Sequence, residues 1–229
     1  MTQRFLTALL CVAALAAALP VRAQPARADV VSRLNTCEAI LQDFQASTKT
    51  AIPADLLRRA RGIIIVNQFQ AGFFLGVKDG YGVVLVRRAN GRWSVPAFLK
   101  AGEISVGLQF GGKSINTVMV LMDDNTARLL FNTHMNLGAE VKAVAGIRSA
   151  ERESVTKALP ADVNVFVYTN VEGLYAGAAV KTGYFSPNLD SNRVLYETNY
   201  RLPELLYSDW VKPPAEVQSL MNYVASITK

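Results

Sequence analysis

The chain has 229 residues, of which 51% are hydrophobic, and it carries a formal net charge of +6 at pH 7. This is enough apolar material for one sizeable core or for two small domains. The basic residues are scattered among acids and form no single stripe, which argues against nucleic acid as a partner. One histidine and two cysteines exclude the usual zinc sites, so neither a metal nor a cofactor is expected.

The first 23 residues have the three parts of a secretory signal peptide. A short basic segment precedes an apolar run from Phe5 to Leu19, and Pro20 and small residues follow. The run is too short to cross a bilayer as a helix. The expected organisation is therefore a signal peptide at residues 1–23 and a single domain at residues 24–229, in a periplasmic or secreted protein.

Two cleavage positions remain open, after Ala23 and after Ala28, because both follow the small-x-small pattern. Lipidation of Cys11 fits poorly, because Leu10 stands where a small residue is required. A buried N-terminal helix in place of a leader is the remaining alternative. In the mature chain Cys37 would be the only cysteine, which excludes an internal disulfide.

Two helices are expected before the first strand. The first has one apolar stripe with steps of four and three residues, formed by Val30, Leu34, Cys37, Leu41 and Phe44. Cys37 lies on this stripe and is expected to be a buried, unreactive thiol. In "IPADLLRRARG", Pro53 suits a first helical position, and Gly62 suits a left-handed residue that ends a second, short helix.

Three short apolar runs predict strands that are covered on both faces, at residues 63–66, 83–86 and 118–122. Residues 105–112 and 137–144 alternate between apolar and polar or small, as strands with one solvent-exposed face do. These strands require helices or a second sheet on both sides of the buried runs.

The stretch "GFFLGVKDGYG" (residues 72–82) raises the question whether its glycines bind a phosphate or shape strands. It lacks the spacing of a P-loop, and it lacks the third glycine and the helix of a dinucleotide fingerprint. Asn90-Gly91 predicts a two-residue hairpin turn, because both positions tolerate a positive φ, and Asp79-Gly80 predicts a second turn. The glycines are thus expected at turns and close strand contacts of an antiparallel meander.

The second half of the chain continues this pattern. Residues 123–131 predict a helix opened by an aspartate cap, and residues 161–170 and 173–183 predict another pair of strands. A closing helix has one apolar face, formed by Val217, Leu220, Met221, Val224 and Ile227. The expected fold class is α+β, with a bent antiparallel β-sheet or barrel-like meander flanked by N-terminal and C-terminal helices.

The chain offers few catalytic groups. His134 stands in "FNTHMN", and no G-x-S-x-G motif accompanies it, so it fits a turn residue better than a catalytic base. Asp123 and Asp124 are better explained by helix capping than by an acid and base pair. The protein is expected not to be an enzyme, with a hydrolase built around His134 as the alternative.

Basic side chains gather on the second helix and around the Asn90-Gly91 turn, as Arg58, Arg59, Arg61, Arg87, Arg88 and Arg92. Four aromatic residues stand near them in the sequence, namely Phe73, Phe74, Tyr81 and Trp93. Arginine beside amphipathic aromatic rings suits an anionic phospholipid membrane surface. A solvated basic face over core aromatics is the alternative.

Trp93 is predicted either to fill the core or to anchor the chain at a membrane interface beside Arg92. By the two-residue period of a strand it shares a face with Val95, which favours the core. Pro96 cannot donate a ladder hydrogen bond, so this strand is expected at a sheet edge or at a bulge.

Four segments in this order resemble one known family: "IPADLLRRARGIIIV", "AGFFLGVKDGYGVVLVRRANGRWSVPAFL", "GLQFGG" and "VFVYTNVEGLYAGAAV…NRVLYE". They are similar to the SYLF family, also called the actin-regulator or lipid-binding domain family, over about residues 52–207. The resemblance implies binding to membrane lipids, with actin filaments as a further ligand in yeast members, and it implies no catalysis. Bacterial members are secreted or envelope proteins.

Two features of this chain depart from the lipid-binding pattern of eukaryotic members. Their N-terminal amphipathic helix contributes basic residues, whereas residues 29–46 here carry Asp29, Glu38 and Asp43 against Arg33 alone. The predicted leader also places the mature chain away from phosphoinositides and actin. The expectation that remains is an envelope protein that binds anionic phospholipid, and the alternative is an envelope protein-interaction or assembly module.

Overall fold

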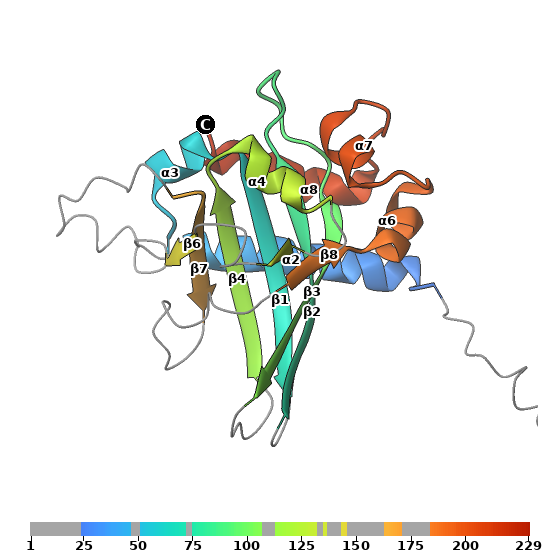
Figure 1. The fold of residues 1–229 in the computed structure, drawn as a ribbon. Helices are drawn as coiled ribbons and strands as arrows, with labels where there is room; N and C mark the ends of the chain where they lie inside the picture. The colour runs from blue at the N-terminus through green and yellow to red at the C-terminus, as the bar shows by residue number, and fades with distance from the viewer. Residues whose placement is uncertain are drawn as a thin grey trace, which may run out of the picture.

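The computed structural model describes residues 24–46, 51–71, 75–106, 113–131, 135–136, 143–145, 163–170 and 184–229. Within them, one open sheet has the strand order β5-β8-β3-β2-β1-β4-β7-β6 (Figure 1). All neighbours are antiparallel except β6 and β7. The strands are β1 (Gly62–Ala71), β2 (Leu75–Val86), β3 (Ala97–Val106), β4 (Lys113–Leu121), β5 (Met135–Asn136), β6 (Ala143–Ala145), β7 (Val165–Asn170) and β8 (Tyr184–Pro187).

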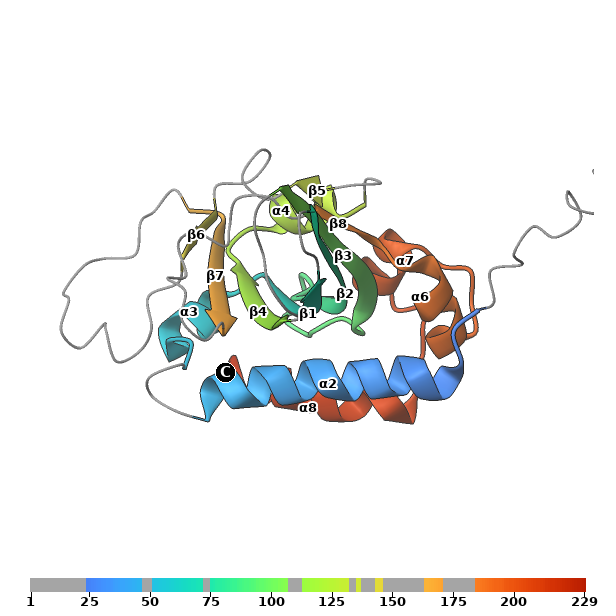
Figure 2. The same cartoon turned by 90° about the horizontal axis from the view of Figure 1, so that it is seen from below.

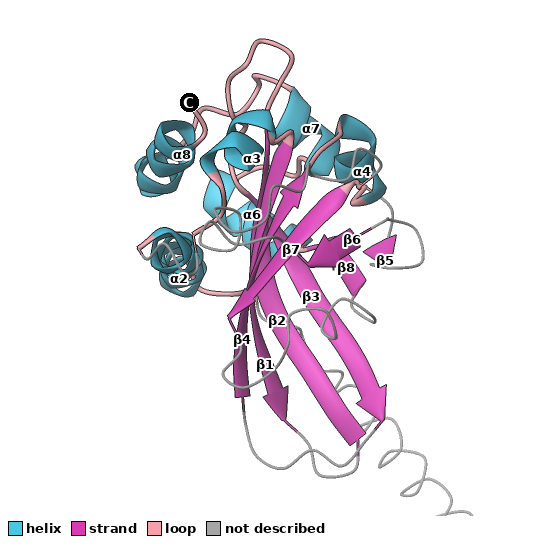
Figure 3. Ribbon diagram, turned by 90° about the vertical axis from the view of Figure 1, so that its left-hand side faces the viewer, coloured by secondary structure: helices cyan, strands magenta, loops and turns pink. Residues whose placement is uncertain are grey.

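Helices cover both faces of this sheet, which confirms the α+β class. On one face α2 (Arg27–Gln45) and α8 (Ala215–Ile227) run side by side (Figure 2). On the other face lie α4 (Asp124–Leu129) and α7 (Leu202–Tyr207) (Figure 3). The other helices in the described residues are α3 (Ala54–Arg59) and α6 (Leu189–Tyr196). No helix in the described part of the chain is both long and apolar enough to cross a membrane.

The central strands are buried on both faces, as their continuous apolar runs predict. Ile63 and Ile65 of β1 belong to the core under α2 and α8, whereas Ile64 and Val66 belong to the core under α4 and α7. The alternation follows from the two-residue period of a strand. Residues 83–86 and 118–121 are divided between the two cores in the same way.

The two terminal helices are also confirmed. The five stripe residues of α2 are all buried, together with Ile40. Burial raises the pKa of the Cys37 thiol to about 12, so this cysteine stays a neutral thiol at physiological pH and is unreactive. In α8, Val217, Leu220 and Val224 are buried and Met221 and Ile227 are partly buried against them.

The predicted turn at Asp79-Gly80 is wrong, because β2 runs through it without interruption and pairs with β1 from Val77 to Val86. A Cβ on Gly80 would lie 2.4 Å from the carbonyl oxygen of Asn67, and one on Gly82 would lie 2.4 Å from that of Ile65. These glycines therefore allow close contact between strands, which confirms the other role predicted for the glycines of this stretch. Residues 72–74, which join β1 to β2, lie outside the described residues.

The hairpin at Asn90-Gly91 is confirmed, but its turn has three residues instead of two. Gly91 has φ +79°, whereas Asn90 is not in the left-handed region. The Gly91 N–H donates to the carbonyl of Arg88, and the Arg88 N–H donates to the carbonyl of Arg92. This is the arrangement of a three-residue loop whose last position is left-handed, and only that position needs glycine.

The shared face of Trp93 and Val95 is a second wrong prediction, because the two side chains enter opposite cores. Residues 94–96 are not a regular strand, so the two-residue period does not apply to them. Ser94 ends the ladder there: its N–H donates to the Val86 carbonyl and its Oγ accepts from the Val86 N–H. Trp93 itself is a core residue, as predicted, and its Nε1 donates to Thr228 Oγ1 at 2.9 Å.

The predicted end of the second helix is also wrong. Helix α3 ends at Arg59, Ala60 has an extended ψ of 133°, and Gly62 is the first residue of β1 without a positive φ. The chain passes directly from helix to strand, since the Arg61 N–H already donates to the carbonyl of Leu121. Pro53, predicted at the first helical position, is instead the N-cap residue of α3.

The aspartate cap is confirmed, because the Thr126 N–H donates to Asp123 Oδ1 at 2.8 Å at the start of α4. Strand β7 confirms the first of the two strands predicted after it, and its predicted partner at 173–183 lies outside the described residues, as do residues 107–112. Of residues 137–144, only 143 and 144 are described, in β6. Sequence analysis did not identify β8, α6 or α7.

Candidate functional site

Four of the six arginines singled out in the sequence converge at one end of the sheet, where β2 ends and β1 begins. Arg58 and Arg61 flank the end of α3, and Arg87 and Arg92 belong to the segment that projects beyond the sheet (Figure 1). The Arg87 guanidinium donates to the Arg58 carbonyl, and its backbone N–H donates to the Arg61 carbonyl, both at 2.8 Å. We call Arg58, Arg61, Arg87 and Arg92 the basic end.

Arg87 is the inner member of the basic end. Its Nη2 donates to the carbonyl of Thr228 at 2.8 Å, and its guanidinium carbon lies 5.2 Å from the centre of the Trp93 ring. Its Nε is buried and has no hydrogen-bond partner among the described residues. Burial, followed by the nearby charge of Arg61, lowers the pKa of Arg87 from its ordinary value, yet an arginine remains protonated.

Arg58, Arg61 and Arg92 are exposed, as is the neighbouring Arg59 on α3. Arg92 lines a groove of about 610 Å³, and all the charged side chains among the described residues that line it are basic. The groove is lined in part by Arg87, Arg92, Trp93, Met221 and Lys229. A groove with one sign of charge concentrates the electrostatic potential and attracts anions.

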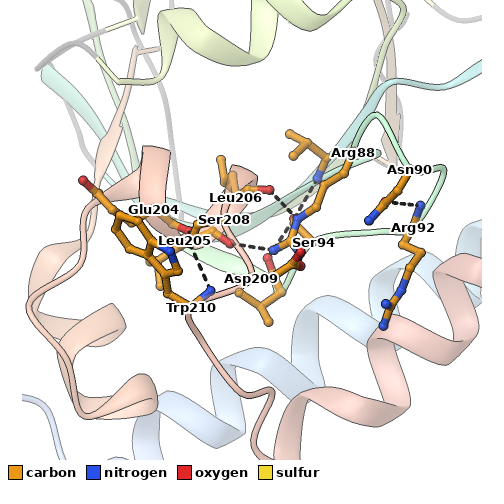
Figure 4. Close-up of polar contacts among 12 residues, drawn as sticks. Arg88, Asn90, Arg92, Ser94, Glu204, Leu205, Leu206, Ser208, Asp209 and Trp210 are labelled. Atoms are coloured by element: carbon orange, nitrogen blue, oxygen red, sulfur yellow. Dashed lines mark hydrogen bonds and ion pairs between the residues drawn. The ribbon is translucent and has the colours of Figure 1, made fainter.

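Arg88 points away from this groove, toward α7 (Figure 4). Its Nε donates to the carbonyl of Leu206 at 2.9 Å, its Nη2 donates to that of Leu205 at 3.3 Å, and its Nη1 pairs with Asp209. The Arg88 side chain is only 14% exposed. Arg88 is therefore a tether between the hairpin and α7, and a role for it in lipid binding stays a prediction.

Of the four aromatic residues named with these arginines, neither of the two that the structure describes is exposed. Trp93 is buried, Tyr81 is half-buried beneath the guanidinium of Arg33, and Phe73 and Phe74 lie outside the described residues. In the described part of the chain the exposed aromatic residues are Phe69, Tyr200 and Trp210, and the rings of Tyr200 and Trp210 lie 5.7 Å apart.

Trp210 is 68% exposed and directly follows Asp209, the ion-pair partner of Arg88 (Figure 4). Sequence analysis missed Trp210, although one signal was present. It stands in "SDWVKPP", a polar stretch with prolines and no apolar period, where a core tryptophan is not expected.

No catalytic constellation was found among the described residues. They hold no group of three or more histidine, cysteine, aspartate or glutamate residues that is able to bind a metal ion. Burial alone would raise the pKa of Asp123, but hydrogen bonds from Thr126, Asn164 and Asn125 bring it below its ordinary value, as a helix cap requires. His134 lies outside the described residues.

Comparison with known proteins gives one consistent result. A family model described as "Ysc84: Las17-binding protein actin regulator" matches residues 102–227. The SH3 domain-containing YSC84-like protein 1 of Homo sapiens is 25% identical over 211 residues, which cover 90% of this chain and 61% of that protein. The LAS seventeen-binding protein 3 of Saccharomyces cerevisiae (strain ATCC 204508 / S288c) is 29% identical over 178 residues, covering 76% of this chain and 38% of that protein. The chain thus spans less than two thirds of the length of either relative.

Proposed function

The chain belongs to the Ysc84 (SYLF) family, and from this premise we propose that it is a non-catalytic protein that binds anionic phospholipid surfaces through its basic end. The observation that carries the proposal is that Arg58, Arg61, Arg87 and Arg92 come together from two separate segments of the chain, next to a groove whose described charged side chains are all basic.

The expected strength of binding follows from the number of exposed charges. Each basic residue near an anionic membrane contributes about 1 kcal/mol, so three or four acting together give measurable binding. The attraction decays within about 8 to 10 Å at physiological salt, and binding should therefore weaken as salt rises. The Tyr200–Trp210 pair, on the other side of the Arg88 tether, supplies amphipathic rings of the kind that lie at headgroup level.

The proposed location is the cell envelope or the extracellular space, after removal of a leader. Of the two cleavage positions, the one after Ala23 fits the fold better. Arg27 lies between them, and it pairs with Glu216 at 2.9 Å and donates to the carbonyl of Val194 at 2.9 Å. Cleavage after Ala28 would remove these contacts between α2, α6 and α8.

A second candidate function is an envelope protein-interaction module. The exposed Tyr200–Trp210 pair favours it, because such a pair also suits a protein docking site. The family model's description names binding to Las17, a protein, for the family. Crosslinking in intact cells separates the two functions: a reproducible protein partner that does not depend on lipid composition would favour this second one.

Liposome flotation of residues 24–229 tests the first function. The protein should float with vesicles that contain phosphatidylglycerol, stay unbound with pure phosphatidylcholine, and lose binding as salt rises. The variant Arg58→Gln with Arg92→Gln should weaken flotation, whereas the matched control Arg193→Gln, an exposed arginine on α6, should not. Equal recovery with both kinds of vesicle at low salt would refute the proposal.

A further inference from the structure

A row of polar side chains interrupts the apolar face of the sheet under α2. Ile65, Val83 and Phe98 lie opposite one another on β1, β2 and β3, and all three are fully buried. Two residues further along, the same face carries Asn67, Tyr81 and Lys100, again directly opposite one another. The buried apolar core therefore stops at this row, since Phe69, the next residue of β1 on this face, is 55% exposed.

Two helices enclose this row. From α2, the guanidinium carbon of Arg33 lies 5.2 Å from the centre of the Tyr81 ring. The second helix is α6, whose first turn lines the pocket. Helix α6 contacts the N-terminal part of α2 (Figure 2). The pocket between them is partly open to solvent and has a volume of about 410 Å³, within the range of small-molecule sites. Arg33, Asn67, Tyr81, Lys100, Asp190 and Ser191 are among the residues that line it.

Ser191, one of the residues that line the pocket, has a side-chain oxygen without a described partner. Ser191 is 1% exposed, and its Oγ is buried with no hydrogen bond to any described residue. Buried hydroxyl groups are nearly always paired, so an orphaned one indicates a missing partner. Ser191 also lies in the first turn of α6, where the helix dipole favours a negative charge.

The charge of the pocket also suits an anion. Arg33 and Lys100 line it, and neither forms an ion pair with a described residue. Among the described residues that line the pocket Asp190 is the single carboxylate, so it compensates one of the two positive charges of Arg33 and Lys100. We infer that this pocket binds a phosphate group, with Arg33 and Lys100 holding its oxygens and Ser191 donating to one of them. Arginine presents a fork of donors that matches phosphate oxygens, and lysine adds a point charge.

This site does not depend on the basic end, since no residue is common to the two. The phosphate can belong to a lipid headgroup that reaches the pocket or to a free phosphate ester. The two sources share the recognising chemistry and differ in whether an acyl chain is needed. Glycerol 3-phosphate and the soluble lipid dihexanoylphosphatidic acid distinguish them.

Calorimetric titration of residues 24–229 with each compound tests the inference. We expect millimolar or tighter binding of at least one compound. Lys100→Gln should weaken that binding about tenfold and Ser191→Ala about fivefold, as the loss of a charged and a neutral hydrogen bond implies. Because Ser191 Oγ makes no bond within the described residues, Ser191→Ala should leave the melting temperature unchanged or raised.

Arg92→Gln is the matched control, since it alters the basic end alone. It should leave titration with the soluble compounds unchanged while it weakens flotation on vesicles, whereas Ser191→Ala should weaken the titration. Binding of the lipid alone would assign the pocket to a headgroup, and binding of both would assign it to phosphate in general. The inference is overturned if neither compound binds, or if Lys100→Gln and Ser191→Ala bind as the unaltered protein does.

Discussion

Arg87 and Arg88 are neighbours in the sequence, yet they serve the two sides of the projecting segment differently. On the Arg87 side, the Arg87 guanidinium donates to two carbonyl groups, and the neighbouring Arg58, Arg61 and Arg92 are exposed. On the Arg88 side, carbonyl groups and Asp209 take up the guanidinium donors. The first side presents exposed arginines that a ligand can reach, and on the second side Arg88 holds α7. The comparison separates residues expected to change binding from residues expected to change stability.

The largest expected effect comes from the residue beneath Arg87. Trp93→Ala should lower the free energy of unfolding by about 3 to 5 kcal/mol, because it empties a buried site and removes the hydrogen bond to Thr228. Urea unfolding followed by circular dichroism measures this. Trp210→Ala, which removes an exposed ring, is the control and should change stability far less. Similar losses in the two variants would show that Trp93 is not a core residue.

Arg88→Gln should come next, with a loss of about 1 to 3 kcal/mol in the free energy of unfolding. The carbonyl groups of Leu205 and Leu206 lose their donor, whereas the pair with Asp209 adds little because Asp209 is 77% exposed. Vesicle flotation of the folded variant should stay close to that of the unaltered protein. A loss of flotation without a loss of stability would place Arg88 in the binding surface instead.

At the basic end we expect the reverse outcome, a loss of membrane affinity without a loss of stability. Arg58→Gln with Arg92→Gln should cost about 2 kcal/mol in membrane affinity, about 1 kcal/mol per charge, with the unfolding midpoint unchanged. Titration with phosphatidylglycerol vesicles at two salt concentrations measures the loss, which should shrink at the higher salt. Unchanged affinity would remove the basic end from the membrane contact.

Sequence patterns were reliable where one local period decides the outcome. The runs at 63–66, 83–86 and 118–122 and the stripe of α2 have this property, and each is buried as expected except at Met122, which follows the end of β4 and is partly buried. Glycines were less reliable, because a turn and a close strand contact favour the same residue. At Gly80 and Gly62 the choice depends on which strand lies alongside, and that information is not local.

In the candidate site, too, the local features were predictable from the sequence and the non-local ones were not. The grouping of Arg58, Arg61, Arg87 and Arg92 was visible in the sequence, but the opposite directions of Arg87 and Arg88 depend on contacts with α8 and α7. The phosphate pocket was not predicted, although Lys100 follows Phe98 by one strand period and so shares its face. The pocket exists only because α2 and α6, far apart in the sequence, meet over that row.

The smallest expected effect concerns Asp123, which caps α4 and belongs neither to the basic end nor to the Arg88 tether. Its carboxylate accepts from the Thr126 N–H and from Asn164, and these bonds lower its folded-state pKa below the ordinary 3.8 against the opposing effect of burial. A group whose pKa is lower when folded stabilises the protein above its unfolded pKa. That contribution is lost as the pH falls through the folded pKa.

Asp123→Ala should therefore cost about 1 kcal/mol at neutral pH, and Asp123→Asn should cost less, because asparagine also caps helices. Urea unfolding between about pH 2 and pH 5 should show a shallower fall in stability for Asp123→Asn than for the unaltered protein. Parallel pH profiles would mean that the charge of Asp123 does not contribute to stability and that its role is capping alone.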